Sequence, residues 1–403
     1  MKNLVFALLL SVFAINATAQ RLLGGDISLL PSYESGGTQY RDSTGKAMPF
    51  FQLVKDQGKW NAIRVRLFVN PADAPQSAKD EGVCQDINYI IPLCKQIKAE
   101  EMRLMLDFHY SDTWADPAKQ FIPKSWTKAG KAVLPDSVYA FTRRSLLRLK
   151  AEGVSPDLIQ VGNEITFGML WPYGKVDPLF NVDGNHSSKA DKSAAANWDF
   201  LAECLKSGSR ACREICPDAK IIIHTEHAQD WKTTYGYYDK LRHYGIDYDV
   251  IGLSYYPMWH GTIAHLNVVL DSLEARFQSK QIMIVETAGY YSHENDPWAT
   301  SPEQYSDLFP ITPQGQAEYT LELVSMLNHH PRVTALFWWF PEENQSGSPQ
   351  IKNWINRGLF DNHTGRALPA FYELAKFRKS RRYRQFRDFP DQQFGRAIPL
   401  SGL

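Results

Sequence analysis

The sequence predicts an α/β protein built as one eight-stranded barrel, and three observations lead to this prediction. Eight short runs of apolar and β-branched residues recur along the chain, and a helical pattern follows them. Strands that alternate with helices form right-handed βαβ units and a parallel sheet. Eight such units in 403 residues suit a single (β/α)8 TIM barrel with long loops. No glycine-rich phosphate loop opens a helix, which disfavours the alternative of a doubly wound open sheet.

The expected strands are short, and turn residues separate each of them from the next helix. Between the strands, apolar residues recur at helical spacing, as Phe141, Leu146 and Leu149 do before the fourth strand. In chain order we expect the strands at residues 22–28, 62–69, 103–108, 158–162, 220–224, 250–254, 281–285 and 333–340.

The connections between these elements are unequal in length. Links from helix to strand are short, whereas four links from strand to helix are long: roughly 109–136, 165–192, 287–313 and 341–357. In such barrels the active site lies at the carboxyl ends of the strands, where these long loops gather. The loops also carry tryptophans, whose flat apolar faces suit the apolar faces of sugars: Trp114, Trp126, Trp171, Trp298 and Trp354.

The two ends of the chain differ from its centre. Residues 1–19 have a positive start, an apolar run of about 12 residues and a small-x-small site at Ala17–Ala19, which is typical of a secretory signal peptide. We therefore expect an exported protein, either periplasmic, attached to the cell surface or secreted, with residues 20–403 forming the barrel. From about residue 376 the tail is basic, which we interpret as a solvated last helix rather than a polyanion site. No segment after the signal predicts a membrane span.

The composition indicates which classes of partner and which cysteine chemistry to expect. The 44 Lys and Arg balance 44 Asp and Glu, so the formal charge is +0, which argues against a nucleic-acid partner. The five Cys are odd in number and suggest buried free thiols, with one disulfide as the alternative. We expect a monomer that needs no cofactor for its chemistry.

Two expected strands end in glutamate, and these carry the functional prediction. Glu164 follows the fourth strand and Glu286 ends the seventh. Desolvating a carboxylate at the end of an apolar strand is costly, so a functional reason is expected. The fourth and seventh strands face each other across the barrel mouth. Two carboxylates there can serve as the acid/base and the nucleophile of a retaining glycosidase.

Neighbouring residues suit the same mechanism. Asn163 can hydrogen-bond a sugar 2-hydroxyl. Arg66 is a charge within a buried strand and is expected to pair with Glu286 and keep it ionised, with Arg64 on the same face as the alternative. At the end of the sixth strand, Tyr255 or Tyr256 is expected to donate a hydrogen bond to Glu286.

Several motifs together resemble glycoside hydrolase family 53, the endo-β-1,4-galactanases. They span nearly the whole chain after the signal, in the same order, and DFHYSDTWADP with GNEI and SYYP is the most specific combination. The matching stretches are GGDISLLPSYE (24–34), IRVRLFVNP (63–71), LMLDFHYSDTWADPAKQ (104–120), QVGNEITFGMLWP (160–172), IGLSYYPMWHG (251–261) and IVETAGYY (284–291).

The resemblance implies roles for particular residues. It makes Glu164 the acid/base and Glu286 the nucleophile of a retaining enzyme that cleaves β-1,4-galactan side chains of pectin, so a polysaccharide is the expected partner. The residues that would line the subsites nearest the cleaved bond are Asp26, Arg66, His109, Trp114, Asn163, Tyr255 or Tyr256, and Trp338 or Trp339.

Two segments need comparison with the family pattern: the one after the fifth strand and the loop after the seventh strand. After the fifth strand the family often has His-x-Asp, whereas this chain has His224-Thr225-Glu226, so Glu226 is the expected sugar-binding residue there. Some bacterial members bind calcium in the loop after the seventh strand. Here that loop carries Glu294, Asn295 and Asp296, oxygen ligands that a structural calcium ion would accept.

Two other classes of protein remain as alternatives. A metal-dependent hydrolase would use histidines near the strand ends, although no HExxH motif is present. A non-catalytic carbohydrate-binding barrel would not require both strand-end glutamates. The histidines that the first alternative would use are His109, His224, His227, His260 and His265.

Overall fold

A computed structural model describes residues 20–294, 308–347 and 356–377 and confirms the barrel. The expected signal peptide, most of the basic tail, Asn295, Asp296, Trp298 and Trp354 lie outside the described residues. No helix among the described residues is long and apolar enough to cross a membrane.

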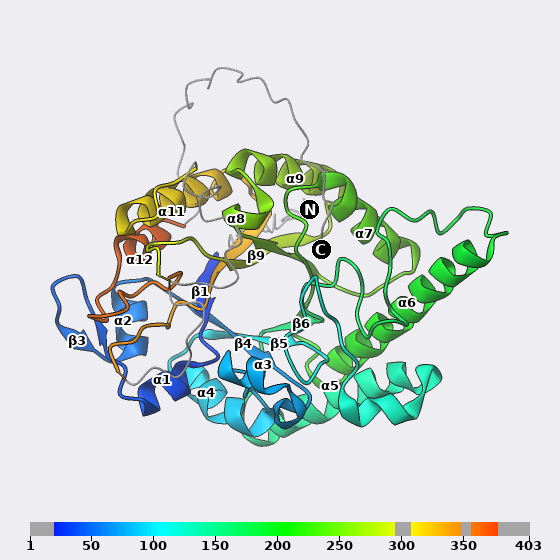
Figure 1. The fold of residues 1–403 in the computed structure, drawn as a ribbon, viewed down its shortest axis with the longest axis horizontal. Coiled ribbons are helices and arrows are strands. Elements are labelled where there is room, and N and C mark those ends of the chain that lie inside the picture. The colour runs from blue at the N-terminus through cyan, green and yellow to red at the C-terminus, as the bar shows by residue number, and fades with distance from the viewer. Residues whose placement is uncertain (1–19, 295–307, 348–355, 378–403) are drawn as a thin grey trace, which may run out of the picture.

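Eight parallel strands close the barrel, because β1 pairs with both the next and the last barrel strand (Figure 1). All eight lie within two residues of the expected bounds. They are β1 (Leu22–Asp26), β4 (Ala62–Leu67), β5 (Arg103–Phe108), β6 (Leu158–Val161), β7 (Lys220–Thr225), β8 (Val250–Tyr255), β9 (Gln281–Thr287) and β10 (Val333–Trp339). A separate two-stranded antiparallel sheet consists of β2 (Tyr40–Arg41) and β3 (Ala47–Met48).

The helices surround the barrel, and α6 extends outward beyond it (Figure 1). The predicted apolar stripe of α5 is buried at Phe141, Leu146 and Leu149. The helices are α1 (Leu30–Ser35), α2 (Phe50–Asp56), α3 (Gln76–Asp80), α4 (Ile87–Ala99), α5 (Leu134–Ala151), α6 (Lys189–Ile215), α7 (Trp231–His243), α8 (Pro257–His260), α9 (Ile263–Arg276), α11 (Pro313–Leu327) and α12 (Pro369–Leu374). The described residues also form three 3-10 helices: η1 (Pro71–Asp73), η2 (Lys124–Ala129) and η3 (Lys131–Val133).

The barrel interior is layered, because side chains of a strand alternate between its two faces. The lowest layer is apolar and forms its own buried cluster, which includes Ala62, Met105, Leu158, Ile222 and Val250. Polar side chains, which are also fully buried, come two residues further along β4 to β7 and four residues after Val250 in β8, and above them lies the mouth of the barrel. The polar layer contains Asp26, Arg64, Asp107, Gln160, His224 and Ser254.

A register shift between β8 and β9 interrupts this alternation. Leu253 pairs with Ile284, whereas Ser254 pairs with Glu286, so Val285 is an extra residue in β9. A bulge of this kind redirects the side chains that follow it. Val285 packs in the apolar layer, and Glu286 rather than Thr287 then faces the interior.

A larger apolar core fills the space between the strands and the helices. All five cysteines are free thiols, as the sequence suggested. Cys94, Cys204, Cys212 and Cys216 are buried, whereas Cys84 is half-buried.

Candidate active site

Glu286 is held by two partners, one on β4 and one directly after β8. Its Oε1 lies 2.8 Å from an amino nitrogen (Nη2) of Arg64, and its Oε2 accepts a 2.8 Å hydrogen bond from the Tyr256 hydroxyl. Burial raises the pKa of Glu286, whereas the Arg64 guanidinium and the Tyr256 hydroxyl lower it, and the balance lies above the ordinary value. Both partners stabilise the carboxylate, which is the form that a nucleophile needs.

Glu164 is held in a different way. The chain leaves β6 through Gly162 at φ +87°, and Glu164 itself has φ +49°, a left-handed backbone that is unfavourable for a residue other than glycine. Its Oε1 accepts a 2.6 Å hydrogen bond from the Ser254 hydroxyl. From the residues that the structure describes, its Oε2 accepts no hydrogen bond, and the side chain is partly exposed.

The charges around Glu164 favour its protonated form. Burial raises the pKa of this carboxyl well above its ordinary value, and the carboxylates of Glu286 and Glu226 raise it further, whereas the Ser254 hydroxyl lowers it. Glu286 has an arginine within 2.8 Å, and Glu164 has no such cation within ion-pair distance among the described residues. Two carboxyls in environments that separate their pKa values suit an acid and a nucleophile.

Arg64 replaces Arg66 as the partner of Glu286, which corrects the expectation from the sequence. Arg64 lies in the buried polar layer, where its guanidinium reaches across the interior to Asp26, Asp107 and Glu286, each at 2.8 Å. Arg66 lies two residues nearer the mouth and pairs with Asp26 at 2.8 Å, while its guanidinium stacks 4.7 Å from the Trp114 ring. The sequence could not distinguish the two, because both face the interior.

Strand alternation separates the two tyrosines. Tyr256 follows Ser254 on the interior face and bonds Glu286, whereas Tyr255 points toward the helices and donates to the backbone oxygen of Gly261 at 2.8 Å. The hydrogen bond expected from either residue therefore comes from Tyr256 alone. The structure gives Tyr255 no contact with Glu286.

The two tryptophans at the end of β10 also lie on opposite faces of their strand. Trp338 is fully buried against Tyr319 of α11, and its indole nitrogen donates to the backbone oxygen of Arg357 at 2.9 Å. This position excludes Trp338 from the barrel mouth, which corrects the expectation for it. Trp339 lies on the interior side, with its ring centroid 6.2 Å from that of Trp114.

The remaining predicted residues lie around or below the two carboxylates. Asp26 is fully buried in the polar layer, and its oxygens accept from Arg64, Arg66 and Ser28. The structure thus places Asp26 as a support for both arginines. Contact between Asp26 and a sugar receives no support from these bonds.

His109 and Asn163 have protein partners of their own. The ring nitrogens of His109 lie 3.0 Å from Asp107 Oδ2 and 3.1 Å from the Ala115 amide, so both are occupied. The Asn163 oxygen accepts from Arg64 at 2.8 Å, and its amide nitrogen donates one hydrogen bond to Ala115 at 2.8 Å. A side-chain amide has two N–H groups, so Asn163 can still donate one to a ligand.

Glu226 lies beside the acid/base candidate. Only 2% of the residue is exposed, and its Oε2 accepts from the Thr166 hydroxyl at 2.8 Å. Its charge contributes to the raised pKa of Glu164. The structure therefore connects Glu226 with the protonation of Glu164, while its predicted sugar contact stays a prediction.

Replacing Glu226 by Gln is expected to shift the pH dependence of activity. Loss of the neighbouring negative charge lowers the pKa of Glu164, so the acid form is lost at a lower pH. The alkaline limb of the profile of kcat/KM against pH should move to lower pH, while the acid limb changes little. Glu203→Gln on the outer helix α6 is the matched control. An alkaline limb that moves upward, or stays fixed, would contradict the electrostatic role.

The histidines do not form a metal centre among the described residues. His224 bonds Ser254, and a ring nitrogen of His260 accepts from the Tyr256 amide. Within the described ranges, three potential ligands come within 4.8 Å of one another at Asp271, Glu274 and His330, on α9 and before β10. The alternative of a metal-dependent hydrolase therefore gains no support from the strand-end histidines.

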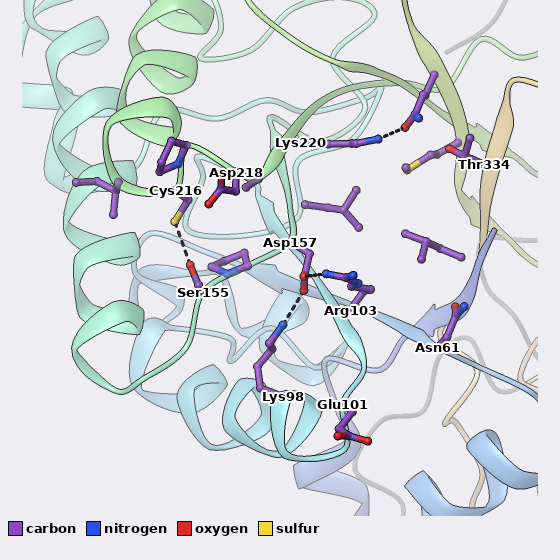
Figure 2. Close-up of a pocket in the computed structure, with 18 of the residues that line it drawn as sticks. Asn61, Lys98, Glu101, Arg103, Ser155, Asp157, Cys216, Asp218, Lys220 and Thr334 are labelled. Atoms are coloured by element: carbon purple, nitrogen blue, oxygen red, sulfur yellow. Dashed lines mark hydrogen bonds and ion pairs between the residues drawn. The ribbon is translucent and has the colours of Figure 1, made fainter. Parts of the chain in front are cut away.

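A cavity of about 1010 Å³ lies at the opposite end of the barrel (Figure 2). Several of its charged groups have partners within the lining: Asp157 bonds Lys98 at 2.8 Å and Arg103 at 2.6 Å, and Lys220 donates to Gln281. Residues at the amino ends of barrel strands generally serve stability. We do not assign catalysis to this cavity.

Sequence reasoning missed the buried polar layer. Its members were detectable as polar residues that follow an apolar interior residue by two positions, as Asp107 follows Met105 and His224 follows Ile222. The alternation alone could not show that they join Arg64, Asn163 and both glutamates into one network. The members that sequence reasoning did not assign to this network are Asp107, Gln160, His224 and Ser254.

The fold and these two carboxyls define a class of enzyme. A parallel eight-stranded barrel carries one glutamate after its fourth strand and another on its seventh, and of the two only Glu286 pairs with an arginine among the described residues, as suits glycoside hydrolases that use two carboxylates. The sequence also identifies the particular family. Residues 22–374 match glycosyl hydrolase family 53, and the chain belongs to this family.

Known relatives and structures agree with this family. The chain is 31% identical over 381 residues to an arabinogalactan endo-beta-1,4-galactanase of Cellvibrio japonicus, which covers 91% of this chain and 94% of that protein. It is 31% identical to an endo-beta-1,4-galactanase of Bacillus subtilis over 79% of this chain and 69% of the other. A family 53 catalytic domain of Ignisphaera aggregans has a TM-score of 0.75 and 28% identity, covering 88% of this chain and 96% of the other.

Proposed function

We propose that the chain is a retaining endo-β-1,4-galactanase that cleaves the galactan side chains of pectin. The observation that carries this proposal is the pair of differently held carboxyls. Arg64 and Tyr256 lower the pKa of Glu286 and stabilise its carboxylate, whereas Glu164 has a raised pKa and an oxygen that no described residue bonds. Galactan is proposed because relatives that cover most of the chain carry the name arabinogalactan endo-beta-1,4-galactanase.

The mechanism follows from these positions. The Glu286 carboxylate attacks the anomeric carbon while Glu164 donates its proton to the departing oxygen, which gives a covalent glycosyl-enzyme. Glu164, now ionised, then takes a proton from a water molecule that attacks the same carbon. The bond to Glu286 breaks, and its carboxylate returns to Arg64 and Tyr256. Both glutamates regain their initial protonation states.

The surrounding side chains would bind the sugar. The second N–H of Asn163 can donate to a 2-hydroxyl, an interaction that strengthens in the transition state. Trp114 and Trp339 lie edge to face with ring centroids 6.2 Å apart, and an aromatic ring face suits the apolar face of a pyranose.

A panel of polysaccharides tests the substrate. The purified protein should release oligosaccharides from β-1,4-galactan and little from mannan, xylan or cellulose, as measured by chromatography of the products. Preferred cleavage of mannan or a glucan would instead make it another β-glycanase of the same clan. Proton NMR of the first-formed product should show the β-anomer, and an α-anomer would contradict retention.

Export is part of the proposal. The apolar run before Ala17–Ala19 directs the chain out of the cytoplasm, and the barrel begins at β1 soon after the cleavage site. Mass spectrometry of the protein from its native host should give a mature chain that starts at Gln20. A chain that retains Met1 in the native host would contradict processing at this site.

We also propose a structural calcium ion near the loops that follow β9 and β10. Glu294 accepts from Asn362 and His363. Near it Glu343 is fully buried, and neither of its oxygens accepts a hydrogen bond from a described residue. Burial, Glu342 and Glu294 raise the pKa of Glu343 well above the ordinary value. A hard divalent cation would compensate this concentration of carboxylates.

Calcium is therefore expected to raise the stability of chelator-treated protein. At a concentration 100 times its Kd, an ion that binds only the folded state adds about 2.7 kcal/mol to the free energy of unfolding. Thermal unfolding with and without CaCl2 measures this, with MgCl2 as the ionic control. Glu343→Gln should abolish the shift. The same melting temperature with and without calcium in the wild type would contradict the site.

A further inference from the structure

A chain of three side chains leads from the acid/base into the barrel interior. The Ser254 hydroxyl on β8 lies 2.6 Å from Glu164 Oε1, and on its other side it lies 2.8 Å from His224 Nε2 on β7. Ser254 and His224 are both fully buried. Neither would touch a substrate, so any influence on the reaction passes through the residues they contact, which are Glu164 beside Ser254 and Asn163 beside His224.

With a neutral His224 and a hydrogen bond at both contacts of Ser254, the protons in this chain allow two arrangements. A hydroxyl has one proton, so Ser254 donates either to Glu164 or to His224. If His224 carries its proton on Nε2, it donates to Ser254, and Ser254 donates to Glu164 Oε1. If His224 carries its proton on Nδ1, Ser254 donates to Nε2. Glu164 can then bond Ser254 only by placing its own acid proton on Oε1.

The second arrangement is unproductive for catalysis. A proton on Glu164 Oε1 is directed at Ser254 in the interior rather than at a leaving group. In the first arrangement Oε1 accepts from Ser254, and the acid proton is on Oε2, the oxygen that no described residue bonds. The position of one proton on a buried imidazole thus determines which carboxyl oxygen acts.

The contacts of His224 favour the productive tautomer. Its Nδ1 lies 3.1 Å from Gln160 Nε2 and 3.4 Å from the Glu164 amide, and both groups are donors. Asn163 Oδ1, 3.0 Å away, is an acceptor, and its two lone pairs already face Arg64 at 2.8 Å and Gln160 Nε2 at 3.1 Å. Among the described residues, Nδ1 is the acceptor of the Glu164 amide, so an unprotonated Nδ1 satisfies that buried N–H.

His224 also stays neutral. Burial lowers its pKa well below the ordinary value, and the charges of Arg64 and His109 lower it further. The imidazole therefore has a single ring proton, which is the condition for a choice between tautomers. A doubly protonated ring would remove that choice.

We propose that His224, protonated on Nε2, is a positioning residue that fixes Ser254 as a donor to Glu164 and so places the acid proton on Glu164 Oε2. This inference rests on the proposed role of Glu164 as acid/base and extends it to two residues that do not touch the sugar. Other groups also influence the titration of these two side chains. Around Glu164 they are Glu286 on β9, Glu226 after β7, Asp116 in the loop after β5 and Tyr256 after β8, and around His224 they are Arg64 on β4 and His109 after β5.

The tautomer can be measured without any activity assay. In wild-type protein labelled with 15N-histidine, the His224 signal, identified by its loss in His224→Gln, should show a protonated Nε2 and an unprotonated Nδ1. These assignments should hold across the pH range of activity. A signal from the Nδ1-protonated tautomer, or from the imidazolium, would overturn the proposal.

Matched substitutions at His224 test its effect on Glu164. Gln places an N–H near the position of Nε2 and should retain most of the activity, whereas Asn places its amide near Nδ1 and cannot reach Ser254. Ser254→Ala removes the donor itself. We expect kcat/KM on galactan to fall about 10- to 100-fold in His224→Asn and Ser254→Ala, and by less than 3-fold in His224→Gln.

A substrate that needs no acid separates positioning from damage to the fold. Dinitrophenyl β-1,4-galactobioside has a leaving group that departs without a proton, so its glycosylation step should be nearly unchanged in all three variants. Ser254→Ala should also move the alkaline limb of the galactan profile to higher pH, because the Ser254 hydrogen bond lowers the pKa of Glu164. Equal losses on both substrates would overturn the proposal. A wild-type enzyme that cleaves neither substrate would instead refute the proposed function, and the NMR result would stand independently.

Discussion

Replacing Glu286 by Gln is expected to abolish the hydrolysis of galactan. Gln is nearly isosteric with Glu but cannot form the covalent intermediate. Loss of an enzymatic nucleophile lowers kcat by a factor on the order of 10⁴ or more. The amide can still accept from Arg64 through its oxygen, so the barrel should remain folded. Initial rates of reducing-sugar release measure the loss, and circular dichroism verifies the fold.

Two further variants make this result specific. Glu318→Gln, on the exposed face of α11, removes the same charge far from the barrel interior and should leave the rate unchanged. Glu164→Ala should lower activity on galactan by roughly 10²- to 10⁴-fold, as expected for a general acid. Glu164→Ala should leave the rate of the glycosylation step on dinitrophenyl substrates nearly unchanged. Residual galactan hydrolysis near the wild-type rate in Glu286→Gln would remove Glu286 from the role of nucleophile.

Replacing Arg64 by Met is expected to destabilise the protein and to shift the acid limb of its activity profile against pH. The guanidinium lies 2.8 Å from each of Asp26, Asp107 and Glu286 and is fully buried. Removing one partner of a buried ion pair costs about 3–5 kcal/mol, because the remaining charge is left without compensation. The free energy of unfolding from urea titration at neutral pH should fall by about this amount.

The same substitution should affect catalysis with a defined sign. Arg64 lowers the pKa of Glu286, so its loss raises that pKa, and the nucleophile is protonated at a higher pH. The acid limb of the activity profile should therefore move to higher pH. Arg103→Met is the control, since its side chain is 63% exposed and its pair with Asp157 should contribute less than about 1 kcal/mol. Equal destabilisation by both substitutions would contradict the central position of Arg64.

The positions of the strands were predictable because short apolar, β-branched runs between turn residues are typical of buried strands. The pairing of Glu286 was not predictable in the same way. Regular alternation from Met283 and Val285 would direct Thr287 inward, and only the bulge at Val285 turns Glu286 toward Arg64. A bulge depends on how β9 pairs with β8, which is a property of the sheet.

The sequence by itself determined the barrel, the two glutamates and the family, because each is expressed in local patterns or contiguous motifs. Only the tertiary structure decided which of two nearby residues contacts Glu286 or lies at the barrel mouth. It selected Arg64 over Arg66, Tyr256 over Tyr255 and Trp339 over Trp338. The reason is physical: alternation assigns a residue to a face, but strand register and bulges determine how far along the barrel axis its side chain lies. The partners of a buried charge depend on this position along the barrel axis, and so does the hydrogen-bonded chain from His224 through Ser254 to Glu164.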